Sequence, residues 1–278
     1  MRIIGEVIWY NPTEAEKGNI KTYLNFVDKL YIIDNSEIEN TIPVNNKKIE
    51  YVFNNENIGI SKAMNRAAKK ALEAGYEWML TMDQDTKMNE YTFKEFNELI
   101  KKVDTSIIGI ITPWHKTKLC TIKPCTKYDY PLDVMTSGNF VNLKILKQIG
   151  FYEERFFIDG IDIEYGLRLA KNGYSIIRMN NAEIEHNLGD ITYHKLFGQQ
   201  IICTNHNYKR QYYMTRNYRY IKEQYEDIFP SYCTNLIKNK KNILTILLYE
   251  KDKIKKIKYI KKGIKDYKNK IYGKLGEN

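Results

Sequence analysis

The sequence predicts an α/β fold built on a mainly parallel, Rossmann-like central sheet. Through the first third of the chain, short apolar runs typical of buried strands alternate with helical patterns of ten or more residues, which indicates βαβ units. The chain has 278 residues, so we expect one large domain with an appendage, or two domains. With 43% hydrophobic and 28% charged residues, it can form a core.

The elements of the first third follow from the period of the apolar residues. Short continuous runs of apolar residues predict strands, and apolar residues at steps of three and four predict helices. The first predicted helix is capped by Thr13 or Asn11. The predicted strands are 2–9, 30–33, 49–53 and 77–82, and the predicted helices are 13–29 and 61–74.

The middle of the chain is less regular. By the same criteria we predict strands at 107–112, 133–136, 175–179 and 183–186, and helices at 143–149 and 162–172. No internal repeat is visible, and a boundary near residue 235 is the only one that the composition supports.

The cysteines and the apolar runs point to a cytoplasmic protein. Cys120, Cys125, Cys203 and Cys233 form no CxxC pair, which favours free thiols in a reducing compartment over a zinc site. No apolar run approaches 18 residues, and the first residues do not resemble a signal peptide. We therefore expect a soluble intracellular protein.

The excess positive charge is confined to the end of the chain. Residues 238–278 carry 14 lysines against four acids, whereas residues 1–237 carry 30 basic and 30 acidic groups. A basic segment of this kind favours an anionic surface, either lipid head groups or nucleic acid. Because the body is neutral, nucleic-acid binding is the weaker interpretation, and we expect no nucleic-acid partner.

The segment 236–278 is predicted to be a basic amphipathic helical tail. Between 253 and 275, apolar residues recur at three- and four-residue steps, and lysines border this stripe. Such a helix either lies in a membrane interface or packs on the rest of the protein with its lysines in solvent, and we expect the first. The residues of the stripe are Ile254, Ile257, Ile260, Ile264, Tyr267, Ile271 and Leu275.

Short polar clusters follow three of the predicted strands. They are Tyr10-Asn11, Asp34-Asn35 and Asp83-Gln84-Asp85. Ligands bind at the carboxyl ends of strands in such sheets, so these clusters indicate a nucleotide site. Two carboxylates one residue apart can ligate a divalent cation, although the same pattern also occurs in solvated turns.

Two further groups of residues could take part in chemistry. Asp159, Asp162 and Glu164 surround a predicted helix start, where they could cap the helix, with Asp159 as the N-cap, or supply a general base. His186 follows a predicted strand and is either a structural residue or a metal ligand.

Taken together, these motifs resemble family 2 glycosyltransferases with the GT-A fold, and most of all their bacterial rhamnosyltransferase branch. The resemblance covers residues 3–265 and is specific only as a set. It rests on Trp9-Tyr10-Asn11-Pro12, Ile33-Asp34-Asn35-Ser36, the segment Asn57 to Asn65, Met82-Asp83-Gln84-Asp85-Thr86, Thr136-Ser137-Gly138-Asn139, Phe157-Ile158-Asp159 with Asp162-Ile163-Glu164, Glu185-His186-Asn187-Leu188-Gly189-Asp190, Arg216-Asn217 and Tyr249-Glu250-Lys251-Asp252.

The resemblance implies a GT-A catalytic domain over 1–235, with a nucleotide-binding half at 1–100 and an acceptor half at 101–235. It implies inverting transfer from a nucleotide-diphospho-sugar, with dTDP-rhamnose as our expected donor and a UDP-sugar as the alternative. The acceptor would be a saccharide or a lipid-linked saccharide at the inner face of the plasma membrane. A homo-oligomer is a further possibility, through Tyr212-Tyr213 and the apolar run 243–249.

The resemblance also implies roles for single residues. Asp162 would be the catalytic base, Asp85 and His186 would ligate Mn²⁺ or Mg²⁺, and Gly160-Ile161 departs from the family pattern on the acceptor side. The residues implied to bind the donor are Tyr10, Asn11, Asp34, Asn57, Asn65, Asp83, Ser137 and Gly138, and those on the acceptor side are Asp159, Glu164 and Arg216.

Two other functions fit the sequence less well. A sugar-nucleotide pyrophosphorylase would carry a glycine-rich, arginine-containing loop after its first strand, and Tyr10-Asn11-Pro12-Thr13 is not such a loop. The other is a non-catalytic basic protein that binds nucleic acid or membrane through the tail; a nucleic-acid-binding protein would carry basic and aromatic residues across the body too, yet residues 1–237 are neutral.

Overall fold

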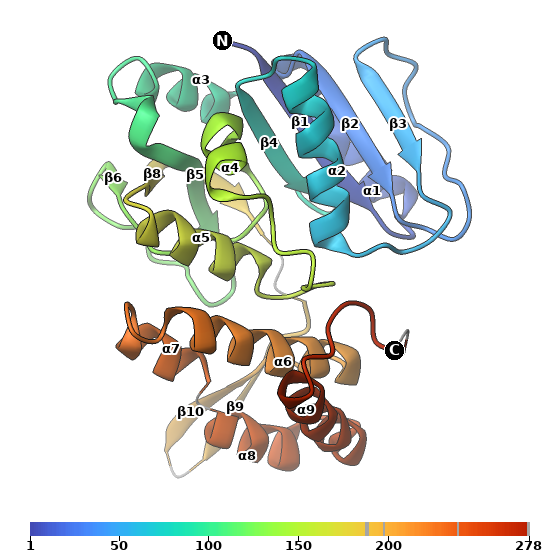
Figure 1. Ribbon diagram of the computed structural model, residues 1–278, viewed down its shortest axis with the longest axis vertical. Coiled ribbons are helices and arrows are strands. Elements are labelled where there is room, and N and C mark those ends of the chain that lie inside the picture. The colour runs from blue at the N-terminus through green and yellow to red at the C-terminus, as the bar shows by residue number, and fades with distance from the viewer. Residues whose placement is uncertain (187–188, 197, 238, 277–278) are drawn as a thin grey trace. The chain divides into compact units, whose positions relative to one another are not determined.

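The computed structural model describes residues 1–186, 189–196, 198–237 and 239–276, and the chain forms two compact units (Figure 1). Unit 1 comprises Met1–Glu153 and Tyr165–Asn187, and unit 2 comprises Glu154–Glu164 and Leu188–Asn278. These units differ from the segments predicted from the sequence, because residues after 235 share a unit with residues before it. The predicted functional division into a catalytic domain and a tail stays a prediction.

Unit 1 is built on an eight-stranded sheet of order β3-β2-β1-β4-β7-β5-β8-β6. Parallel pairing joins β1 to β2 and β4, β2 to β3, and β5 to β8, whereas β6 and β7 run antiparallel to their neighbours. The predicted mainly parallel sheet is therefore confirmed. The strands are β1 Ile3–Trp9, β2 Lys29–Asp34, β3 Ile49–Phe53, β4 Trp78–Asp83, β5 Ile108–Lys116, β6 Tyr128–Asp129, β7 Asn139–Asn142 and β8 Ser175–Glu185.

Helices cover this sheet because each has an apolar face to bury. Ile3, Val7 and Trp9 of β1 belong to one core cluster with Phe93 and Phe96 of α3. α2 lies along β1 in Figure 1 and buries a face made largely of alanine. The helices are α1 Glu14–Gly18, α2 Ile60–Glu73, α3 Glu90–Leu99, α4 Leu143–Ile149 and α5 Ile161–Lys171, whose first four residues belong to unit 2; single 3₁₀ turns occur at Asn19–Thr22, Leu24–Phe26 and Thr105–Ile107.

Three predicted elements are corrected by the structure. The helix expected at 13–29 ends at Gly18, and 3₁₀ turns follow that bury Ile20 and Leu24 in the core; its Thr13 cap is confirmed. No strand forms at 133–136; the strand is β7, which begins at Asn139. The two strands expected at 175–186 are the single strand β8, whose register shifts opposite Pro113 and Trp114.

Unit 2 is mainly helical and carries a two-stranded antiparallel hairpin. Of these elements, only a helix in the tail was predicted. None of the helices within the described part of the chain is long and apolar enough to cross a membrane. The elements are β9 Thr192–Leu196, β10 Gln199–Cys203, α6 Tyr208–Tyr225, α7 Pro230–Leu236, α8 Asn239–Tyr249 and α9 Lys253–Lys268.

The tail helix is confirmed in kind, but its apolar stripe is not free. α9 packs side by side with α6 and buries Lys256, Ile260, Gly263 and Asp266 (Figure 1). Ile254, which the stripe included, is 88% exposed, whereas Ile260 is 3% exposed. The buried side of α9 therefore faces its own unit, as the alternative interpretation expected, and membrane binding stays a prediction.

Candidate donor and metal site

The predicted polar clusters of unit 1 lie at the carboxyl ends of parallel strands. Asp34 is the last residue of β2 and Asp83 the last residue of β4, and both strands pair with β1. The backbone N–H of Tyr10 donates to Gln84 Oε1 at 2.8 Å, and that of Asn11 donates to Ser36 Oγ at 2.8 Å. The segment after β1 is thus tied to the segments after β2 and β4.

Asp34 is a fully buried carboxylate held by several donors. Its Oδ1 accepts from the Ser36 N–H at 2.9 Å, and its Oδ2 accepts from Tyr51 Oη at 2.6 Å and Asn40 Nδ2 at 2.9 Å. Burial by itself would raise the pKa of Asp34, but the hydrogen bonds lower it by more. The pKa of Asp34 therefore lies below its usual value. Asp34 is therefore an ionised acceptor.

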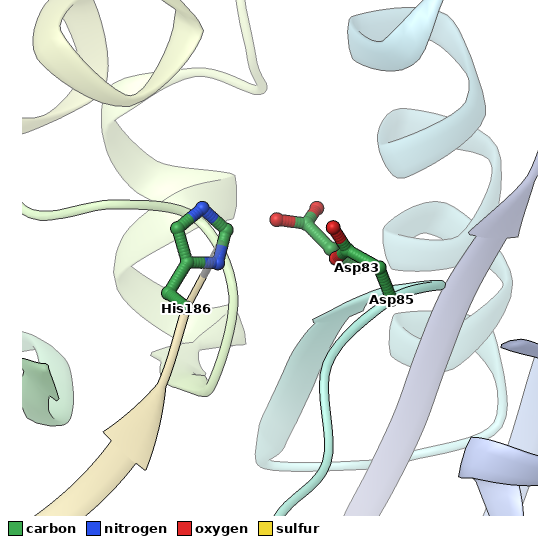
Figure 2. A group of neighbouring side chains, drawn as sticks. All are labelled: Asp83, Asp85 and His186. Carbon is green, nitrogen blue, oxygen red and sulfur yellow. The ribbon is translucent and has the colours of Figure 1, made fainter. Parts of the chain in front are cut away.

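Asp83, Asp85 and His186 converge, as Figure 2 shows. One ligand atom from each lies within 4.8 Å of the others. Asp83 and Asp85 share a turn closed by a hydrogen bond from the Thr86 N–H to the Asp83 carbonyl at 3.1 Å. His186 follows β8, and its backbone N–H donates to the Lys116 carbonyl at 3.0 Å. Strand pairing thus assembles a cluster from residues about one hundred positions apart in the sequence.

His186 has the properties of a metal ligand. Its Nδ1 is buried and has no hydrogen-bond partner among the residues that the structure describes. Burial lowers the pKa of His186 against the opposing charge of Asp85, so the imidazole is neutral near pH 7. An imidazole nitrogen with two carboxylates fits a divalent cation, and suits Mn²⁺ better than Mg²⁺, which prefers oxygen ligands.

Ser137 and Gly138 lie against the end of β4. The Asp83 N–H donates to Ser137 Oγ at 3.0 Å, and the Gly138 N–H donates to the Thr81 carbonyl at 2.7 Å. Gly138 has φ +80°, and a Cβ there would lie 3.0 Å from Ile184 Cδ1, so glycine is required. The turn therefore supports Asp83, while its predicted contact with the sugar stays a prediction.

His115 is a site residue that the sequence reasoning missed. It lies in β5, its Nε2 is 2.6 Å from the Ser137 carbonyl, and its ring meets the His186 ring edge to face with centroids 6.1 Å apart. Burial lowers the pKa of His115 to about 4, so the neutral ring donates to that carbonyl. The only signal in the sequence was a histidine three residues after the predicted strand 107–112.

Two predicted donor-binding residues have structural partners in unit 1. Asn65 is buried, and its amide bonds both the carbonyl and the N–H of Tyr152 at 2.9 Å. Asn57 Oδ1 accepts from the Gly59 N–H at 3.0 Å, just before α2. These hydrogen bonds hold the backbone at Tyr152 and at Gly59. Contact of Asn65 and Asn57 with the donor stays a prediction.

In unit 2, Asp159 is not the helix cap that the spacing suggested. The first hydrogen bond of α5 runs from the Glu164 N–H to the Gly160 carbonyl at 2.9 Å, so the cap is Gly160. Asp159 has φ +67° and instead forms an ion pair with Arg210, whose Nε lies 3.1 Å from Oδ1 and 3.2 Å from Oδ2.

Asp162 and Glu164, both in the first turn of α5, differ in exposure. Glu164 is 4% exposed and accepts from Tyr225 Oη at 2.7 Å. Asp162 is only half-buried and accepts from the adjacent Ile163 N–H at 2.9 Å. Of the two, Asp162 has the side chain that solvent reaches more readily.

Arg216, predicted on the acceptor side, is fully buried in unit 2. It donates to Tyr212 Oη at 3.2 Å, to the Gly273 carbonyl at 2.9 Å and to the Arg155 carbonyl at 3.2 Å. These bonds hold the segment after α9 against α6, and a contact with the acceptor stays a prediction.

Known proteins match this chain in sequence and in fold. The profile of glycosyl transferase family 2 matches residues 23–166. The dTDP-rhamnosyl transferase RfbF of Shigella flexneri is 24% identical over an alignment of 233 residues, and the match covers 77% of this chain and 78% of RfbF.

Two solved structures with low sequence identity share the fold. GalNAc-T7 with UDP, GalNAc and Mn²⁺ has a TM-score of 0.61 at 12% identity, over 98% of this chain but only 56% of its own. TarS 1–349 of S. aureus has a TM-score of 0.59 at 12% identity, over 98% and 83%. The likeness shows the GT-A fold.

Proposed function

Because this chain belongs to family 2 of the glycosyl transferases, we propose that it moves L-rhamnose from dTDP-rhamnose to a saccharide or lipid-linked acceptor, with inversion at the sugar carbon. The dTDP-rhamnosyl transferase activity in the name of RfbF supports the choice of donor. A UDP-sugar is the second candidate, supported by the UDP in the GalNAc-T7 structure.

The observation that carries the proposal is the cluster of Asp83, Asp85 and His186 at the end of β4. Asp85 and His186 would hold Mn²⁺, with Asp83 beside them. A bound divalent cation supplies neutralisation of the charge that grows on the departing diphosphate. The buried, unpartnered Nδ1 of His186 is consistent with this role.

Two further carboxylates, Asp34 and Asp162, would serve nucleotide binding and removal of the acceptor's proton. Asp34, which is ionised and buried, would hold the turn after β2 in place, and this turn and Asp83 together would hold the base and ribose of the nucleotide. Asp162 would remove the proton of the acceptor hydroxyl, which is weakly nucleophilic until then. Its place in the first turn of α5 favours the ionised form. Direct attack by the hydroxyl inverts the sugar carbon, and no covalent sugar–enzyme species is needed.

We further propose that the protein works at the inner face of the plasma membrane, bound peripherally through unit 2. The net positive charge of 238–278 supports this location, since anionic head groups attract such segments.

A donor panel tests the activity and the metal together. We expect release of the nucleoside diphosphate from dTDP-rhamnose in preference to UDP-sugars, and loss of release with EDTA that Mn²⁺ restores. Asp85→Ala should abolish transfer, whereas Asp83→Ala should chiefly weaken donor binding. Full activity in EDTA, or an unchanged rate for Asp85→Ala, would contradict the metal assignment.

Asp162→Asn tests the base. The amide keeps the shape of the side chain but cannot accept the proton, so kcat should fall on the order of 10²-fold or more. Nucleotide-sugar binding, measured by calorimetry, should stay unchanged. Glu164→Gln is the matched control, and an inactive Glu164→Gln beside an active Asp162→Asn would move the base by two residues.

A further inference from the structure

We propose that unit 2 docks on an anionic lipid surface through the outward face of α8. This face consists of Leu244, Leu247 and Leu248, and we call it the leucine face. It is distinct from the α9 stripe expected from the sequence, part of which is buried against α6. The proposal deepens the peripheral location proposed above and needs neither the donor site nor the metal.

The leucine face is apolar and open. Leu244 is 50% exposed, Leu247 48% and Leu248 45%, and their spacing of three and four residues places them on one side of the helix. On the opposite side Ile246 is fully buried. α8 thus carries apolar side chains both inward and outward, and an exposed group of large apolar residues marks an interaction surface.

Contacts within unit 2 hold α8 in place. Glu250, just after the helix, accepts from Lys256 Nζ at 2.7 Å in a buried ion pair. Lys253 Nζ donates to the Leu248 carbonyl at 3.3 Å, and Tyr249 Oη donates to the Lys195 carbonyl at 3.3 Å. The leucine face is therefore presented by a fixed element and not by a loop.

Positive charge follows the leucine face along the chain, and Lys253 Nζ reaches the carbonyl of Leu248, the last leucine of the face. Lys251, Lys253, Lys255 and Lys258 are all exposed and follow Leu248 within ten residues. Over 250–265 the acids are Glu250, which is neutralised by Lys256, and Asp252. Ile254, 88% exposed, adds a further apolar side chain among these lysines.

Leucines bordered by lysines match the chemistry of an anionic bilayer interface. The apolar side chains enter the boundary between head groups and acyl chains, and the lysines meet the phosphates. A second copy of this chain fits less well, because an isologous contact would bring the same lysines of both copies together. The charge pattern therefore favours lipid as the occupant.

Sedimentation with vesicles tests the leucine face. The full chain should bind vesicles of phosphatidylcholine with 30% phosphatidylglycerol, and bind pure phosphatidylcholine much more weakly. The triple variant Leu244→Ser, Leu247→Ser, Leu248→Ser should bind at least tenfold more weakly. The matched control is Ile38→Ser, Leu119→Ser, Ile122→Ser, which removes three exposed apolar side chains from unit 1 and should bind like the original chain.

Charge removal tests the lysines separately. Lys251→Ser with Lys258→Ser should weaken binding to the anionic vesicles and make it less dependent on salt. Lys94→Ser with Lys101→Ser removes the same charge from exposed positions of unit 1 and should change neither property. Equal loss in both pairs would mean that only net charge matters, and would overturn the assignment to this surface.

A fluorescent probe gives a readout that folding defects do not imitate. The fluorescence emission of the new tryptophan in Leu247→Trp should shift to shorter wavelength when anionic vesicles are added, and brominated acyl chains should quench it. The emission of the new tryptophan in Ile122→Trp should show neither effect. An unquenched Leu247→Trp, or a triple variant that sediments like the original chain, would refute the proposal. The proposal would also be refuted if light scattering showed that the full chain is a dimer, that the triple variant is a monomer, and that vesicle binding is the same for both.

Discussion

Glu6 is a buried acid in the middle of β1, with a consequence for stability. It is 1% exposed, and its Oε2 has no partner among the described residues. Burial, with a smaller contribution from the charge of Asp83, raises the pKa of Glu6 to about 8. Glu6 is therefore mostly protonated in the folded protein at pH 7.

This pKa predicts a pH-dependent effect of Glu6→Gln. Between pH 4.5 and 8 the unfolded chain loses the Glu6 proton while the folded chain keeps it, so the free energy of unfolding falls as pH rises. Glutamine removes this loss, which is about 1.4 kcal/mol per pKa unit. Glu6→Gln should therefore raise Tm by several degrees more at pH 8 than at pH 4.5, by calorimetry. The exposed Glu73→Gln is the control, and an equal shift at both pH values would count against the assignment.

His115 predicts an effect on the metal without contacting it. His115→Phe keeps an aromatic ring but leaves the Ser137 carbonyl without its donor, loosening the turn that holds the Asp83 N–H. Changes to such supporting partners typically cost about 10- to 100-fold in metal affinity. Mn²⁺ titration followed by electron paramagnetic resonance, with no sugar donor present, should show this loss. His194→Phe, in unit 2, should leave Mn²⁺ affinity unchanged.

At the scale of elements, the packing of α9 on α6 depends on Gly263. A Cβ at this position would lie 2.7 Å from the Tyr212 carbonyl oxygen, which is backbone and can yield only if the helices separate. The two helices therefore pack closely because glycine stands at their contact.

Gly263→Ala should destabilise unit 2 although alanine favours a helix by about 1 kcal/mol over glycine. The measurement is the urea midpoint of unfolding, which should fall. Gly18→Ala is the matched control, because a Cβ there meets no atom within 4 Å, and its midpoint should stay or rise. A higher midpoint for Gly263→Ala would show that the contact is looser than the structure indicates.

At the scale of the whole molecule, the C-terminal segment is part of the structure of unit 2. Lys256 neutralises the buried Glu250, Asp266 accepts from Tyr212 Oη at 2.7 Å, and the Gly273 N–H donates to the Arg155 carbonyl at 3.0 Å. Removing 252–278 would leave Glu250 buried without Lys256 and would take the Gly273 carbonyl from the buried Arg216, and a buried charge without its partner is costly.

A chain that ends at Lys251 should therefore lose the stability of unit 2 while the sheet of unit 1 persists. Limited proteolysis should cut within 188–251 much faster than in the full chain, and a fragment that contains residues 1–186, with all eight strands of the sheet, should survive. The point variants of the leucine face avoid this damage. Equal proteolysis of the truncated and full chains would show that α9 is dispensable for folding.

Local patterns determined much of the fold and the donor side of the site. The strand Ile49–Phe53 and the helix Leu143–Ile149 have the predicted bounds, because each has a clear apolar pattern with polar boundaries. Asp34 and Asp83 were predicted at strand ends and lie there, since a run of apolar residues marks a parallel strand wherever it packs. The place of such a strand in the sheet follows from no local pattern.

Tertiary structure decided what depends on contacts between distant residues. α6 escaped prediction because its buried side chains include Arg216 and Asn217, whose hydrogen-bond partners make burial possible and are invisible in a periodic pattern. His186 joins Asp83 and Asp85 only through the pairing of β4, β7, β5 and β8. The sequence alone determined that α9 is an amphipathic helix, but only packing decided that α6 covers one of its sides and that the open apolar face belongs to α8. Periodicity specifies the sides of a helix, whereas what each side meets depends on the other elements that compete to cover it.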